Sequence, residues 1–112
     1  MDDNFTLFDL EVSVEGDPKT FVCSHVAGPA FQVISENLVF HSGIDQFSMY
    51  ALSALLPLLP AKQRPTHPHD WMTTDALIAC PDPYCGAKFR IKRIGETVRS
   101  HAESTRVSLD GN

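Results

Sequence analysis

The sequence predicts a small α+β domain, in which a curled, mostly antiparallel sheet of five or six strands packs around one central apolar helix. Residues 8 to 14 and 88 to 92 alternate between apolar and polar side chains, which is the period of a half-buried strand. Residues 45 to 59 are apolar on nearly every side of a helix, so several neighbouring elements are expected to cover them. Eight prolines and six glycines keep the elements short.

The first half of the chain predicts three or four strands. The first covers Phe8–Val14 and ends at the turn formed by Gly16, Asp17 and Pro18. Two or three short strands follow between residues 21 and 41. They are expected at Phe21–Cys23, Phe31–Ile34 and Leu38–His41. We expect the first strand to lie near the last one of the sheet.

The central helix is predicted from Asp45 to Leu59. Ser42 or Asp45 can cap its start, because a short side-chain oxygen accepts an otherwise unpaired backbone N–H. Pro57 and Pro60 end the helix or break its last turn, since proline lacks that N–H. One stripe of the helix consists of Phe47, Tyr50, Ala51, Ala54, Leu55 and Leu58.

The second half predicts a loop and then a hairpin. Residues 61 to 70 are polar and rich in proline, which is typical of a loop, and Trp71 begins the next packed segment. A strand is expected at Ala76–Cys80. The turn signal Pro81–Gly86 then leads into the alternating strand Lys88–Lys92.

A chain of 112 residues has the size of one domain. Residues 1–95 are predicted to form the compact part, and residues 96–112 a polar C-terminal arm or short helix. The chain contains no run of about 20 apolar residues, as a membrane-spanning helix requires. Its acidic start differs from a secretory signal, and three cysteines do not suggest a secreted disulfide framework. A cytoplasmic protein without membrane partners is therefore expected.

Charge is unevenly distributed along the chain. The net charge of −5 disfavours binding to nucleic acids, which need a basic surface. Residues 1 to 17 contain acidic side chains and no Lys or Arg, whereas residues 88 to 93 contain basic ones and no acid. We expect these segments to be neighbours in the sheet, with opposite charges paired across its exposed face. An acidic patch for a basic partner is the alternative.

Cys23 and His25 form the first candidate site. On a strand, two residues at this spacing lie on one face, so a thiolate–imidazole pair for nucleophilic catalysis is conceivable. A buried cysteine beside an exposed histidine is the more common arrangement, and no third orienting residue stands out.

The second candidate is the cluster His67-Pro68-His69-Asp70. Two imidazoles and a carboxylate could bind a metal ion or transfer protons. However, Pro68 favours an extended backbone that sends adjacent side chains in opposite directions. We therefore expect a solvated loop here.

Cys80 and Cys85 are the candidate metal ligands, separated by four residues. Structural zinc sites usually contain more closely spaced ligand pairs. Cys80 is therefore interpreted as a small buried residue at a strand end and Cys85 as a turn residue, with no metal expected. Asp82 either fixes the turn through its own backbone or presents a carboxylate at a pocket rim.

Ligand binding has three further candidates, Tyr50, Trp71 and Cys80. Trp71 could stack on a ligand, although a lone tryptophan in a small domain is usually part of the core. The sequence contains no glycine-rich phosphate loop, no Gly-x-Ser-x-Gly motif and no His-Glu-x-x-His motif, so no cofactor is expected.

Several segments resemble a family of short, uncharacterised bacterial and archaeal proteins. Its members typically show an Ala-x-x-x-Leu-x-Pro helix, a Trp-x-x-x-Asp segment, a Cys-Pro-Asp-Pro turn and a final Phe-x-Ile-x-Arg-Ile strand. The matching segments, within residues 8 to 94, are Leu52–Leu59, Asp70-Trp71, Cys80-Pro81-Asp82-Pro83 and Lys88–Ile94. The resemblance implies a common fold and no particular activity.

Two departures from this family stand out. Many members carry a Gly-Asp-x-Phe turn where this chain has Ala27-Gly28-Pro29-Ala30-Phe31. Many also carry a cysteine just before the helix, where this chain has Gln46-Phe47-Ser48. If that cysteine belongs to a functional site, this chain has lost it or works differently.

Three classes of function remain open. The first is a small non-catalytic module, an accessory subunit or binding protein for a partner protein or a small molecule, which could also form a homo-oligomer. The second is a cofactor-independent isomerase, lyase or hydrolase with Cys23 or Cys80 as nucleophile. Its acid–base residues would come from His25, His41, His67, His69, Asp70 and Asp82. The third is a Cys/His zinc-binding protein.

The enzyme and the binding module predict different arrangements of the same side chains. Convergence around a cavity would favour an enzyme, whereas scatter over the surface would favour a binding module. The side chains whose positions distinguish the two functions are Cys23, His25, Asp70, Trp71, Cys80 and Asp82.

Overall fold

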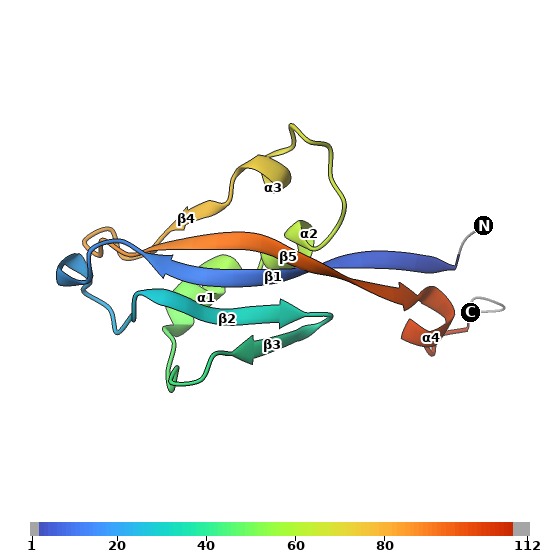
Figure 1. Cartoon of the computed structure of the whole chain (residues 1–112), viewed down its shortest axis with the longest axis horizontal. Helices are drawn as coiled ribbons and strands as arrows, with labels where there is room; N and C mark the ends of the chain where they lie inside the picture. Colours follow the sequence, from blue (N-terminus) through green and yellow to red (C-terminus); the bar gives the residue numbers. More distant parts are fainter. Residues whose placement is uncertain (1–2, 109–112) are drawn as a thin grey trace.

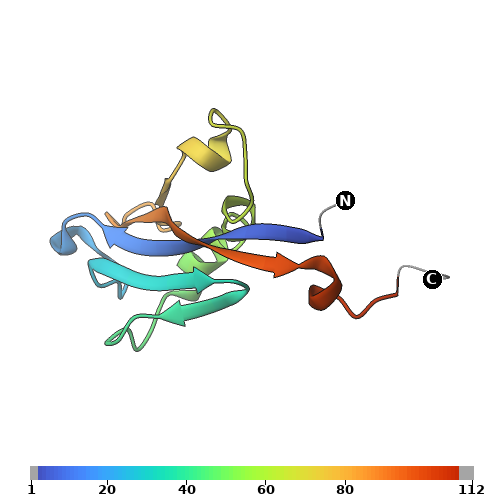
Figure 2. The same ribbon diagram turned by 45° about the vertical axis from the view of Figure 1, so that its right-hand side comes forward.

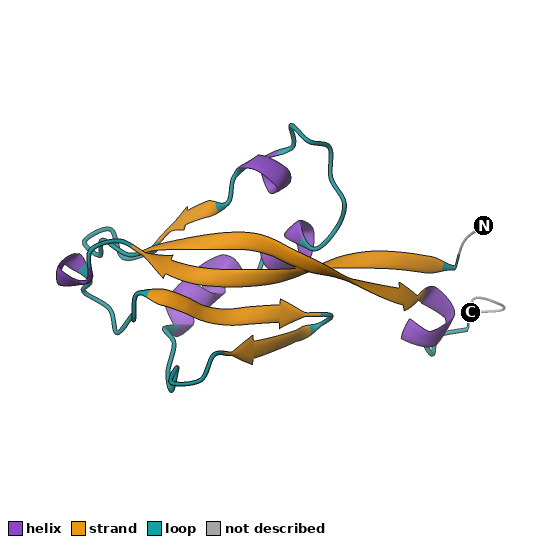
Figure 3. Cartoon of the chain, viewed as in Figure 1, coloured by secondary structure: helices purple, strands orange, loops and turns teal. Residues whose placement is uncertain are grey.

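Five antiparallel strands form one open sheet in the computed structural model, which describes residues 3 to 108. Their order in the sheet is β3-β2-β1-β5-β4 (Figure 1). The strands are β1 Asn4–Glu15, β2 Gly28–Ile34, β3 Asn37–Phe40, β4 Leu77–Ala79 and β5 Lys88–Ser100. The helices are η1 Pro18–Thr20, α1 Met49–Leu55, α2 Leu59–Lys62, α3 Trp71–Thr74 and α4 His101–Ser104 (Figure 3). The predicted α+β class is confirmed, and the sheet has five antiparallel strands, where five or six mostly antiparallel ones were expected.

The first and last strands are neighbours, as predicted, and they are also the longest. They pair from Asn4↔Ser100 to Glu15↔Lys88, with a bulge next to Asp9. Their outer halves continue past the other strands as a two-stranded ribbon that ends at α4 (Figures 1 and 2). Residues 96 to 100 therefore belong to β5, whereas the sequence placed them in the arm. Residues 109 to 112 of that arm lie outside the described residues.

The core lies on one face of the sheet, where α1 and α2 pack (Figure 1). Residues that alternate along the strands point toward these helices and are buried, as the period-two pattern predicts. The largest fully buried side chains are Phe31, Phe89, Leu10, Leu55 and Val12. Among the described residues, no helix is long and apolar enough to cross a membrane.

The central helix is shorter and less covered than predicted. It begins after Ser48, whose hydroxyl accepts the N–H of Ala51, and it ends before Pro57. Met49 and Tyr50 are 69% and 70% exposed. The expected all-round covering was wrong, because the sheet lies along one side of α1 and leaves the opposite side in solvent.

Trp71 does not belong to the core. It is 75% exposed and starts α3, whose first turn is capped by the carboxylate of Asp70. The loop before α3 carries this segment away from the sheet (Figure 1). An interior position for Trp71 was therefore a wrong prediction.

Opposite charges pair on the exposed face of the sheet, as expected. The carboxylate of Glu15 on β1 accepts hydrogen bonds from Nε and Nη2 of Arg90 on β5. Glu11 lies opposite Lys92 in the same register and also accepts a hydrogen bond of 3.2 Å from Gln32. The acidic start and the basic segment thus lie side by side in the sheet, and Glu15 and Arg90 form an ion pair between them.

Candidate metal centre

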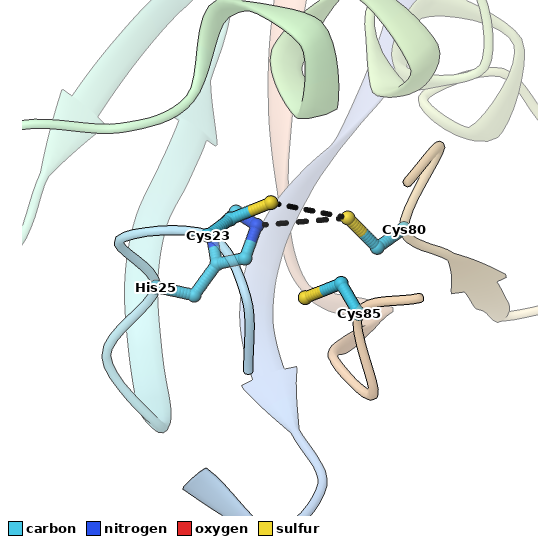
Figure 4. A group of neighbouring side chains, drawn as sticks. All are labelled: Cys23, His25, Cys80 and Cys85. Atoms are coloured by element: carbon cyan, nitrogen blue, oxygen red, sulfur yellow. Dashed lines mark hydrogen bonds between the residues drawn. The ribbon is translucent and has the colours of Figure 1, made fainter. Parts of the chain in front are cut away.

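Two segments far apart in the sequence meet at one edge of the core. The loop between η1 and β2 contributes Cys23 and His25, and the loop between β4 and β5 contributes Cys80 and Cys85. One ligand atom from each of these four side chains lies within 4.8 Å of the other three (Figure 4). The Sγ atom of Cys80 is 3.9 Å from that of Cys23 and 3.8 Å from Nε2 of His25.

These distances match the edges of a zinc tetrahedron. A zinc–sulfur bond of about 2.3 Å at tetrahedral angles places two sulfur atoms roughly 3.8 Å apart, and a sulfur and an imidazole nitrogen slightly closer. The distances of Cys80 to Cys23 and His25 fall at this separation. The side chains can therefore surround one metal ion with little movement of the backbone.

Backbone hydrogen bonds hold the two loops together. The N–H of Gly86 donates to the carbonyl of Thr20 at 3.0 Å. The N–H of Val22 donates to Sγ of Cys85 at 3.4 Å. The expected strand at residues 21 to 23 is instead this loop, because its polar groups bond to the hairpin turn rather than to a neighbouring strand. Cys23 and His25 are consequently aimed at one point without sharing a strand face.

Asp82 shapes the turn between the two hairpin cysteines. Its Oδ1 accepts the N–H of Tyr84 at 2.9 Å, and its carbonyl accepts the N–H of Cys85 at 3.0 Å. These bonds confirm the predicted turn role of Asp82. They fold the four intervening residues so tightly that both cysteine sulfurs face the same point.

Aromatic rings enclose the imidazole of His25. The ring of Phe89 meets it edge-on at 4.9 Å, and the rings of Phe47 and Phe21 lie at 5.6 and 6.4 Å. This burial lowers the pKa of His25 and favours the neutral imidazole. A neutral imidazole is the form that binds a metal ion.

The three thiols have different acidities in the metal-free protein. Burial, together with the neighbouring Cys80 and Cys85 groups, raises the pKa of Cys23 to about 12. Burial also raises the pKa of Cys80. At Cys85 burial acts in the same direction, but the backbone N–H groups of Cys23, Ala87 and Val22 outweigh it and lower the pKa to about 7. Deprotonation of all three thiols at this close range therefore requires a cation between them.

The close approach of the loops depends on Gly86. A Cβ atom there would lie 2.0 Å from Oγ1 and 2.6 Å from Cβ of Thr20. We expect Gly86→Ala to push Thr20 and the loop that follows η1 away from the hairpin turn. This should destabilise the fold by about 1–3 kcal/mol and weaken metal binding. Urea denaturation and competition with a chromophoric chelator measure the two effects.

The control for this variant is Gly86→Ala combined with Thr20→Gly, which removes the atoms in the way. The double variant should recover most of the metal affinity. Equal affinity of the wild type and the single variant would contradict the role of this contact.

The remaining predicted residues fall into two places. Tyr50 and Cys80 line one pocket of about 270 Å³, together with Cys23, Ser48, Pro81 and Asp82. Trp71 and Asp70 lie apart from it, beside His69 and Met72. Cys23, His25, Cys80 and Asp82 thus converge, whereas Asp70 and Trp71 do not.

The loop containing His67 and His69 is exposed to solvent, as expected, but its two rings do not point apart. The two imidazole rings lie 5.5 Å apart, so Pro68 does not send them in opposite directions. The backbone N–H of His69 donates to Nδ1 of His67 at 3.1 Å, and the carboxylate of Asp70 accepts the N–H of Met72. Within residues 3 to 108, the grouping of three or more metal-binding side chains is the Cys23 cluster and not this loop.

His41, a candidate acid–base residue, also lies away from the cluster. Its Nε2 is 3.7 Å from a carboxylate oxygen of Glu11. This places it at the end of β3 beside the charged face of the sheet. It is not one of the side chains that converge with Cys23 and Cys80.

Sequence reasoning named Cys80 and Cys85 as candidate metal ligands but did not foresee that Cys23 and His25 join them. Cys80 and Cys85 were set aside because they were compared with more closely spaced ligand pairs. The available signal was that the chain contains two short donor pairs, Cys23/His25 and Cys80/Cys85. Their meeting in space could not be derived from spacing within either pair.

Compared with known proteins, the chain matches no family model, no curated protein and no solved structure. The resemblance suggested by the Trp71 segment and the Cys80-Pro81-Asp82-Pro83 turn therefore stays a prediction.

Proposed function

We propose that this chain is a zinc-binding protein, in which Cys23, His25, Cys80 and Cys85 hold one structural zinc ion in a small non-catalytic binding module. The observation that carries this proposal is the convergence of their ligand atoms within 4.8 Å. A protein partner and a homo-oligomer stay predictions.

The donor set favours zinc over other ions. Thiolate and imidazole ligands in a tetrahedral arrangement are typical of zinc, whereas calcium and magnesium prefer oxygen ligands. Catalytic zinc usually has three protein ligands and an open position for water. Four protein donors here complete the tetrahedron, which supports a structural role and favours the binding module over the enzyme.

The zinc ion would join the two loops at the edge of the core. A chain of this size has a small hydrophobic core, which supplies only part of the folding free energy. Metal binding would add to it. The positive charge of the ion would allow all three thiols to be deprotonated at close range.

Metal analysis of the purified, reduced protein tests the proposal. We expect one zinc ion per chain, and replacement by Co²⁺ should produce thiolate-to-cobalt absorption in the near ultraviolet and tetrahedral bands in the visible. Cys80→Ser should lose both the zinc and these bands. Cobalt spectra without thiolate-to-metal absorption would contradict the Cys3His ligand set.

The matched control is His69→Ala, compared with His25→Ala. His69 lies in the other histidine-containing loop, beside His67, outside the cluster. We expect His69→Ala to retain one zinc ion and His25→Ala to bind it at least about tenfold more weakly. Zinc binding that is weakened in His69→Ala but not in His25→Ala would contradict the proposed ligands and place the metal in the loop of His69.

Zinc binding should release protons. At pH 7 the raised pKa values keep Cys23 and Cys80 protonated, and Cys85, with a pKa of about 7, is half protonated. Binding therefore releases one proton from each of the first two and about half from the third, or roughly 2.5 protons. Zinc affinity is expected to fall as pH falls, with the steepest dependence below pH 7.

Calorimetric titration in two buffers with different ionisation heats measures this number. His25 adds nothing to it, because burial already keeps its imidazole neutral. A release of one proton or fewer at pH 7 would show that the three thiols are not all ligands.

A further inference from the structure

We propose that the pocket beside the metal centre binds a small organic cation, with a primary ammonium group attached to an apolar body of about ten non-hydrogen atoms. This inference rests on the proposed zinc site, because the bound zinc sets the charge of one pocket wall. The pocket has a volume of about 270 Å³ and is lined by Cys23, Ser48, Tyr50, Cys80, Pro81 and Asp82.

Two metal ligands form part of the pocket wall. Cys23 and Cys80 both line it and both belong to the cluster of four donors. Three thiolates, one neutral imidazole and one Zn²⁺ carry a net charge of −1, because the charge of the ion offsets only two of the thiolates. The metal centre therefore presents a negative charge to a molecule in the pocket.

Asp82, which also lines the pocket, adds a second negative charge. One of its oxygens accepts the N–H of Tyr84, and a carboxylate can accept several further hydrogen bonds. None of the described residues that line the pocket is Lys, Arg or His. An anion would therefore meet two like charges, whereas an ammonium group would find two opposite ones.

Other lining residues of the pocket favour an apolar, flat body. Tyr50 contributes a ring that is largely exposed, and Pro81 contributes an aliphatic ring. The hydroxyl of Ser48 already accepts the N–H of Ala51 as the cap of α1. A tyrosine face attracts cations as well as apolar groups, so both parts of the proposed ligand have a matching surface.

Titration of the zinc-loaded protein with phenethylammonium tests this inference, with chemical shifts of the backbone amides as the readout. Zinc content is measured first, so loss of the metal would count against the zinc site and not against the pocket. We expect saturable shifts at the amides of Tyr50 and Asp82. Phenethyl alcohol, which has the same shape without the charge, should bind at least about tenfold more weakly.

Two variants locate the binding site. Asp82→Asn keeps an oxygen for the N–H of Tyr84 but removes the charge, so phenethylammonium should bind about tenfold more weakly. Asp45→Asn is the control, because Asp45 lies just before α1 but lines other pockets. It should leave the affinity unchanged.

Titration with a second compound distinguishes two possible sources of the ammonium group. Nα-acetyl-lysine methylamide represents a lysine side chain of a peptide, and phenethylammonium represents a free amine. Tighter binding of either one supports the pocket and assigns its source. Zinc-loaded protein that binds neither at 10 millimolar, binds the alcohol equally well, or shows its shifts elsewhere would overturn the inference.

Discussion

Removal of zinc by a chelator, with a reductant present to keep the thiols reduced, is expected to lower the melting temperature by about 15 °C or more. In the proposed arrangement, Cys23, His25, Cys80 and Cys85 bind zinc in the folded chain, and the unfolded chain, in which these side chains are apart, binds it far more weakly. At a free ion concentration about a thousand times the dissociation constant, this difference stabilises the fold by about 4.1 kcal/mol. For a domain of this size, 1 kcal/mol corresponds to about 4 °C or more.

The loss of stability after removal of zinc should differ between parts of the structure. Hydrogen exchange is expected to quicken first at the amides of Val22 and Gly86, whose hydrogen bonds join the two loops. The pairing of β1 with β5 should stay protected longer, since it runs along the whole sheet.

Cys80→Ser is the control for the chelator experiment. The variant should melt near the temperature of the chelated wild type, and the chelator should not lower it further. An unchanged melting temperature of the wild type after complete removal of zinc would contradict a structural role for the ion.

Phe89→Ala is expected to cost about 3–5 kcal/mol of folding free energy. The side chain of Phe89 is fully buried at the centre of the core and contacts Phe47 with ring centres 5.9 Å apart. Its loss leaves a cavity that the sheet cannot close. Urea denaturation of the zinc-loaded protein measures the change, and Phe40→Ala, at a 41% exposed position, should cost only about 1 kcal/mol.

The same substitution should also weaken zinc binding, because the Phe89 ring meets the imidazole of His25 edge-on. Phe31→Ala separates this effect from general destabilisation. Phe31 is equally buried, but its ring contacts are with Phe40 and Phe47. Zinc affinity reduced to the same extent in both variants would contradict a positioning role for Phe89.

Local patterns in the sequence were enough to predict most of the sheet. The alternation in residues 8 to 14 and 88 to 92 depends on which side chains are buried, and period two places those side chains on one face wherever the strand pairs. The turn at Asp82 was predictable for a similar reason, since its carboxylate bonds a backbone group two residues away.

The length of β5 and the exposure of α1 were not predictable in this way. Residues 96 to 100 are polar except for Val98, yet they form a strand because β1 supplies paired backbone groups along the ribbon. Tyr50 is apolar in pattern but lies in solvent, because the sheet covers only one side of α1. Each outcome depends on what lies opposite a residue, which its neighbours in sequence do not specify.

The sequence by itself therefore determined the α+β class, the antiparallel strands and the placement of the turns. It did so through the alternation of apolar and polar residues and the turn residues, which act over a few residues. The candidate metal centre required the tertiary structure. Cys23 and Cys80 are 57 residues apart in sequence, and only the pairing of the strands and the close contact at Gly86 place their sulfur atoms 3.9 Å apart. A donor set assembled from two loops has no local signature, because each half alone resembles an ordinary turn.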